Sequence, residues 1–130
     1  MHVGVLPVEG AWAVGEVAAP VAEPDVDAWV REALTTALAS RGALDPGGRP
    51  VSVTVTEASF RPARRSGDVL LYEARLTVRF VAGEREGVRS RTWTVRDPGN
   101  AADARALRED TFRTLSRQVV EDGVAWLLAP

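Results

Sequence analysis

The stretch from Leu70 to Phe80 constrains the fold most, because its side chains alternate between apolar and polar. Successive residues of a β-strand point to opposite faces of a sheet, so this strand has one face for a core and one for water. The apolar set is Leu70, Tyr72, Ala74, Leu76, Val78 and Phe80, and the polar set is Glu73, Arg75, Thr77 and Arg79. Such a pattern predicts an antiparallel sheet that is covered on one side only.

Two amphipathic helices can supply that cover. Apolar residues at helical spacing predict the first helix within residues 25–42, with Asp25 as its N-cap and Gly42 at the C′ position past its end. A second, longer helix is predicted over residues 101–128, with Asn100 as its cap. Gly123 lies inside this helix, where it either kinks the chain or allows close packing.

The remaining segments complete the predicted order of elements. Residues 2–8 form a short β-rich run that Gly10 closes, and residues 10–24 show no period, so they are expected to form an irregular arm. Residues 51–56 alternate valine with serine or threonine, and the phase then slips near Glu57, which predicts a bulge. Residues 88–96 form the last strand. The 130 residues therefore predict one α+β domain in the order β-α-β-β-β-α, an antiparallel meander sheet with both helices packed on one face.

Several classes of function lack the residues they need. The chain has no cysteine and one histidine, His2, so nucleophilic and general acid–base catalysis are not expected, and neither a metal nor a cofactor is predicted. A net charge of -2 argues against a general nucleic-acid binder. The longest apolar run, residues 124–129, is too short to span a bilayer. The sequence therefore favours binding over catalysis.

The arginines form the main candidate site. All 16 basic residues are arginine, and residues 61–96 hold nine of them against four acidic residues. Arg61, Arg64 and Arg65 flank the predicted turn of the central hairpin, where guanidinium groups can pair with phosphate or carboxylate. If the strands pair in order, four further arginines share the exposed sheet face below the turn: Arg75, Arg79, Arg89 and Arg91. The alternative is that arginine, the default cation of a GC-rich genome, only keeps these surfaces soluble.

Trp12 is a second candidate, because it lies in the predicted arm and no periodic pattern calls for its burial. An exposed tryptophan of this kind is typical of a contact with a partner or ligand. Alternatively, the indole pins the arm to the domain.

The order of elements and several segments resemble the LptE family, the outer-membrane lipoproteins of lipopolysaccharide assembly. The resemblance rests on "VGVLPVEG" as the opening strand, "LTTALASRGAL" in the first helix, and "VSVTVTEASFRP" followed by "YEARLTVRF" in the meander. The final "RQVVEDGVAWLLA" is also similar to the last helix of auxiliary lipoproteins of ABC-type lipid transport systems.

The LptE resemblance implies a non-enzymatic protein on the periplasmic face of the outer membrane. Members are anchored through a lipidated N-terminal cysteine, occupy the lumen of the LptD β-barrel and bind lipopolysaccharide through basic loop residues. Those positions correspond here to Arg61, Arg64 and Arg65. No such cysteine is present in these residues, so we expect that a signal peptide and anchor were removed ahead of Met1. If Met1 is the native start, a cytoplasmic α+β interaction domain is the alternative.

Overall fold

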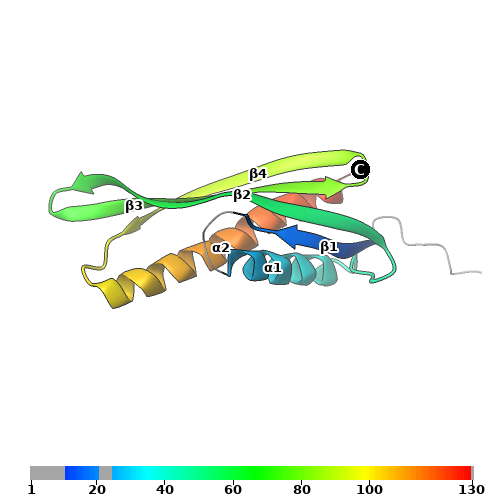
Figure 1. Ribbon diagram of the computed structural model, residues 1–130, viewed down its shortest axis with the longest axis horizontal. Helices are drawn as coiled ribbons and strands as arrows, with labels where there is room; N and C mark the ends of the chain where they lie inside the picture. Colours follow the sequence, from blue (N-terminus) through cyan, green and yellow to red (C-terminus); the bar gives the residue numbers. More distant parts are fainter. Residues whose placement is uncertain (1–10, 21–24, 130) are drawn as a thin grey trace, which may run out of the picture.

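The computed structural model describes residues 11–20 and 25–129, which form one sheet layer and one helix layer. Figure 1 shows β3 and β4 above α1 and most of α2, with both helices on the same side of the sheet, so the predicted element order and the one-sided cover are confirmed. The described elements are β1 (Trp12–Ala18), α1 (Val26–Ser40), β2 (Arg49–Ser66), β3 (Val69–Ala82), β4 (Arg85–Arg96) and α2 (Ala101–Leu127).

The sheet has the strand order β1-β2-β3-β4. β2, β3 and β4 form the predicted antiparallel meander. β1 pairs with β2 in parallel, which the antiparallel prediction did not include. A parallel pair needs a crossover connection, and α1 provides it between β1 and β2.

The position of β1 corrects the predicted arm. The structure has a strand at Trp12–Ala18, inside the segment expected to be irregular. Its hydrogen bonds come from distant residues: the Trp12 amide donates to the Ala43 carbonyl at 2.7 Å, and the Trp12 carbonyl accepts from the Asp45 amide at 2.8 Å. Tertiary pairing therefore makes this strand where the local pattern does not. The strand predicted at residues 2–8, His2 and residues 21–24 of the arm lie outside the described residues.

The core lies between the sheet and the helices. Its largest fully buried side chains include Phe80 of β3, Phe112 of α2 and Leu34 of α1. The ring of Phe80 packs directly against Gly123, where a Cβ atom would lie 2.2 Å from the ring carbon Cζ. Gly123 was expected either to kink the helix or to allow close packing, and the structure supports close packing.

The helix ends mostly follow the prediction. Gly42 adopts a left-handed φ of 65° just after α1, and the Asn100 side chain accepts a hydrogen bond from the Asp103 amide at the start of α2. Asp25 precedes α1 as predicted, but it has a φ of 66° and its side chain makes no capping hydrogen bond. Its carbonyl instead accepts the Trp29 amide at 3.0 Å.

The β2–β3 hairpin contains the predicted bulge and one more. The register shifts between Val55 and Glu57, as the change of phase indicated, and again between Pro62 and Arg64. Each bulge alters which side chains face the helices. The hairpin ends at the same end of the molecule as the first turns of α2 (Figure 1).

Candidate binding surfaces

The predicted tip arginines lie in the hairpin arm, which we define as residues 61–71. β2 continues to Ser66, so Arg61, Arg64 and Arg65 are strand residues and the turn is shorter than predicted. Residues directly opposite each other in an antiparallel pair share a face. Arg61 lies opposite Glu73 and Arg64 opposite Leu71. Both therefore point to the open sheet face, the surface of β2, β3 and β4 that is turned away from the helices.

Arg65 lies opposite Leu70 and points to the other side. All three arginines are exposed. The hairpin therefore presents two arginines on one face and one on the reverse, which does not amount to a single converging cluster.

The prediction that four further arginines share the exposed face is wrong for two of them. Arg75 and Arg79 lie opposite Thr92 and Val88, on the open sheet face. Arg89 and Arg91 lie opposite the buried residues Val78 and Leu76, and so point toward the helix layer. Because β4 is the edge strand, their long side chains can reach past the core and keep their charge in water.

Arg91 makes a two-pronged ion pair with α2. Its Nε and Nη2 atoms donate to the two carboxylate oxygens of Asp122 at 2.7 and 2.9 Å. This hydrogen bonding lowers the pKa of Asp122 and raises that of Arg91. The pair fastens the edge strand to the helix, so Arg91 is occupied.

On the open sheet face, Arg79 is also occupied, because its Nε donates to Glu86. The hydrogen bond lowers the pKa of Glu86. In residues 11–20 and 25–129, Arg61, Arg64 and Arg75 pair with no carboxylate. Glu73 lies opposite Arg61 and two residues from Arg75 along β3. Thr77, whose Oγ1 is 2.8 Å from Ser90 Oγ, lies between Arg75 and Arg79. The face is therefore polar, uncovered by the helices and rich in unpaired guanidinium groups.

A shallow groove of about 330 Å³ lies at the hairpin tip. Its lining is Arg65, Asp68, Val69, Leu70, Arg96, Asp97 and Gly99. Two arginines face two aspartates there, so this groove has no excess of positive charge. Arg61 and Arg64 lie outside this groove, on the open sheet face.

Trp12 is buried, with 3 % of its surface exposed, and it belongs to the core. The Arg49 guanidinium lies over its ring, 4.5 Å from the ring centre. A partner cannot reach a side chain in this position, so the interpretation as a contact residue is wrong. The alternative holds, because the indole pins β1 to the domain.

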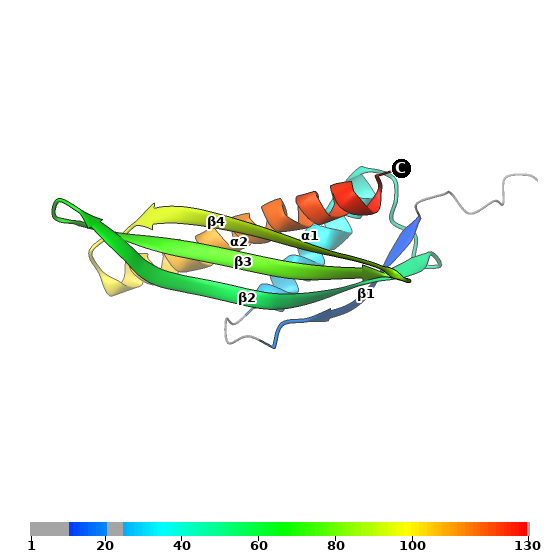
Figure 2. The ribbon, with the colours of Figure 1, turned by 90° about the horizontal axis from the view of Figure 1, so that it is seen from above.

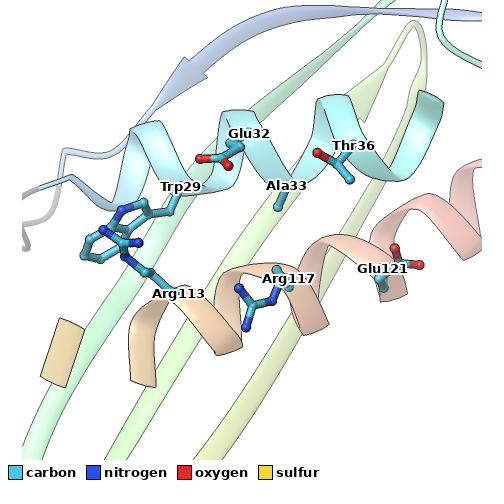
Figure 3. Close-up of a pocket in the computed structure, with 7 residues that line it drawn as sticks. All are labelled: Trp29, Glu32, Ala33, Thr36, Arg113, Arg117 and Glu121. Atoms are coloured by element: carbon cyan, nitrogen blue, oxygen red, sulfur yellow. The ribbon is translucent and has the colours of Figure 1, made fainter. Parts of the chain in front are cut away.

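A second groove, of about 350 Å³, runs between α1 and α2 (Figure 3). Trp29 lies at one end with the Arg113 guanidinium 5.2 Å from its ring centre, and an ion pair between Arg41 and Glu121 lies near the other end. Trp29 is half-buried and packs against the core. The small side chain of Ala33 leaves room between the helices. No pattern in the sequence indicates this groove, because it forms where two helices that are distant in the chain meet.

The described residues contain no group of three or more side chains able to hold a metal ion. In the same part of the chain, no helix combines the length and the apolar character that a membrane crossing requires.

Comparisons with known proteins identify the class of fold. No protein-family model matches the sequence, and no curated protein matches it. Solved structures do match over most of the chain, at 12 to 19% identity, and these establish a shared α+β fold.

Three structures with TM-scores above 0.5 illustrate the likeness. A candidate lipoprotein from Caulobacter crescentus is 19% identical, with a TM-score of 0.59 and coverage of 84% of this chain and 85% of that one. A DUF330 protein from Xanthomonas campestris is 18% identical, with a TM-score of 0.54 and coverage of 94% and 85%. The rare lipoprotein B of Shewanella oneidensis is 12% identical, with a TM-score of 0.52 and coverage of 88% and 91%.

Proposed function

We propose that the chain is the folded domain of a bacterial envelope lipoprotein of the LptE type, which acts by binding. The observation that carries the proposal is the open sheet face, where Arg61, Arg64 and Arg75 pair with no carboxylate of the described chain. The fold supports it, because rare lipoprotein B belongs to the LptE family. The Caulobacter protein with the same fold is also a candidate lipoprotein.

The chemistry of this face suits an anionic surface. Guanidinium groups bind phosphate and carboxylate through paired hydrogen bonds. The three arginines lie on strands of one sheet, so their backbone is already ordered before binding. The ligand in this proposal is lipopolysaccharide, which is bound by Arg61, Arg64 and Arg75. The protein partner is an outer-membrane β-barrel of the LptD kind, and the domain is lipid-anchored on the periplasmic face of the outer membrane.

A second candidate function is that of an auxiliary lipoprotein in an ABC-type lipid transport system. The observation that favours it is the shared fold with the DUF330 protein, since that family is of the ABC-auxiliary type. The same open sheet face then contacts a transporter component.

The test compares two triple variants of the purified domain. Arg61→Glu/Arg64→Glu/Arg75→Glu reverses the charge of the open face, and Arg31→Glu/Arg105→Glu/Arg117→Glu makes the same change on the helix layer. Binding of purified lipopolysaccharide is measured by calorimetry. We expect the first variant to lose about tenfold or more in affinity, corresponding to loss of about 1.4 kcal/mol, and the second to bind like wild type.

Equal binding of lipopolysaccharide by both variants would show that the open sheet face is not the binding site. Absence of binding by the wild type would show that lipopolysaccharide is not the ligand. Affinity purification from envelopes then separates the two candidate functions. Recovery of a β-barrel protein supports the LptE type, whereas recovery of a permease or substrate-binding component supports the ABC-auxiliary role.

A further inference from the structure

The outer edge of β4 is long, regular and open. β4 is the last strand of the sheet, and its twelve residues pair with β3 from Leu71↔Arg96 to Ala82↔Arg85 without a register shift. The backbone groups of its other edge have no strand partner in the described residues, although the Val88 carbonyl accepts a hydrogen bond from the Arg89 side chain at 2.8 Å. An exposed edge of this kind is a template for pairing with another chain.

The opposite edge of the sheet lacks these properties. β1 has seven residues, and its pairing with β2 is interrupted between Val14 and Val17. Short and irregular edge strands are a common way to prevent pairing with another chain. β4 is therefore the edge of the sheet that can still pair with another chain.

The exposed large apolar side chains of the described chain both lie on β4. Val88 is 52 % exposed and Trp93 is 42 % exposed. Val88 lies opposite Arg79 on the open face, whereas Trp93 lies opposite Ala74 on the helix side. A strand added at this edge would place alternate side chains on both faces, and so would cover each of these residues.

The helix layer would cover one face of such a strand. The Trp126 ring of α2 fills the space above Gly87, where a Cβ atom would lie 2.8 Å from the ring, and Asp122 holds Arg91. Figure 2 shows the C-terminal half of α2 emerging past β4 on its outer side. An added strand would therefore lie beside β4 and over α2, with one face shielded from water.

The positive charge along the edge of β4 determines which kind of chain can pair with it. Arg85, Arg89 and Arg96 pair with no carboxylate in the described residues, while Glu86 is already held by Arg79. A second copy paired through β4 would bring arginine-rich strands together, and like charges on neighbouring strands destabilise the pairing. We propose that β4 accepts an extended, acidic segment of a partner protein as a fifth strand of the sheet.

The proposal stands apart from the lipopolysaccharide assignment, because it concerns backbone pairing at β4 and not the arginines of the hairpin arm. A failed lipopolysaccharide test leaves it intact, and its own failure leaves the open sheet face unaffected.

The probe is an acetylated and amidated ten-residue peptide in which glutamate alternates with valine or threonine. Two control peptides have lysine in place of glutamate, or methyl groups on three consecutive central backbone nitrogens of the glutamate peptide. Calorimetric titration should show saturable binding of the glutamate peptide and at least tenfold weaker binding of both controls. Arg89→Glu should weaken binding at least tenfold, while Arg31→Glu, on the exposed surface of α1, should not change it.

Four outcomes overturn the proposal. Absence of binding by the glutamate peptide removes the site. Equal binding of the methylated peptide excludes strand addition, and equal binding of the lysine peptide excludes an acidic partner. Sedimentation of the wild-type protein as a dimer that Trp93→Arg converts to a monomer would assign the edge to a second copy instead.

Discussion

At the scale of single residues, Gly123 sets the approach of α2 to β3. Its missing side chain leaves room for Phe80, whose ring is 1 % exposed and cannot move into water. We expect Gly123→Ala to lower the free energy of unfolding by about 1–3 kcal/mol, as overpacking in a core does. At an exposed helical glycine the same substitution would raise the free energy of unfolding by up to about 1 kcal/mol. The sign of the change therefore distinguishes a packed glycine from an exposed one.

Urea unfolding followed by circular dichroism measures this change. Gly47→Ala is the matched control, because a Cβ atom there meets only the Asp45 Oδ1 atom at 3.6 Å, an ordinary contact. An alanine at position 123 that leaves stability unchanged or raises it would contradict the packing argument.

The ion pair between Arg91 and Asp122 predicts a pH dependence at the same scale. The hydrogen bonds from Arg91 hold the pKa of Asp122 in the folded protein below its ordinary value of 3.8. The unfolded chain therefore takes up the proton first as the pH falls. This contribution to stability is fully present above 3.8, and it is lost as the pH drops through the folded pKa.

Asp122→Asn should remove that part of the acid sensitivity. Urea midpoints measured from about pH 6 to about pH 2.5 should fall less steeply in the variant than in wild type. Asp110→Asn, on the exposed surface of α2, is the control and should follow the wild-type curve. Parallel curves for Asp122→Asn and wild type would show that the ion pair does not contribute to folding.

At the scale of elements, the sequence predicts those that carry their own pattern. β3 alternates along its length, and α1 and α2 repeat their apolar residues at helical spacing, so their faces were predicted correctly. β1 has no such pattern, because distant residues and β2 supply its hydrogen bonds. The faces of β4 were predicted wrongly for a related reason. Arg89 and Arg91 look like water-facing residues in one strand, and only the register with β3 places them on the helix side.

Trp12 provides a test of how β1 is held. Because its indole is buried in the core, we expect Trp12→Ala to lower the free energy of unfolding by about 3–5 kcal/mol. Trp93→Ala removes the same side chain from an exposed position on β4, and it should change stability little. Chemical denaturation of both variants makes the comparison, and an equal loss in the two would refute the role of Trp12 as the anchor of β1.

At the scale of the whole molecule, the charge is unevenly distributed. The net charge is -2, yet residues 61–96 carry nine arginines against four acidic residues. These residues form the hairpin arm, β3 and β4, so the excess of positive charge belongs to the sheet layer in Figure 1. The remaining residues carry the compensating negative charge. We expect a molecule with this uneven charge to approach an anionic surface with the hairpin arm, β3 and β4 first, even though it is acidic overall.

This polarity predicts salt-sensitive association with anionic lipid. The domain should bind vesicles that contain phosphatidylglycerol, and should not bind vesicles of phosphatidylcholine alone. The affinity should fall several-fold between about 20 mM and about 200 mM salt, because the screening length shortens over that range. Arg75→Glu lies in the middle of the open sheet face and should weaken binding, whereas Arg31→Glu on α1 should not. Co-sedimentation measures both effects. Binding that is indifferent to salt, or that weakens equally in both variants, would mean that the sheet layer does not orient the domain.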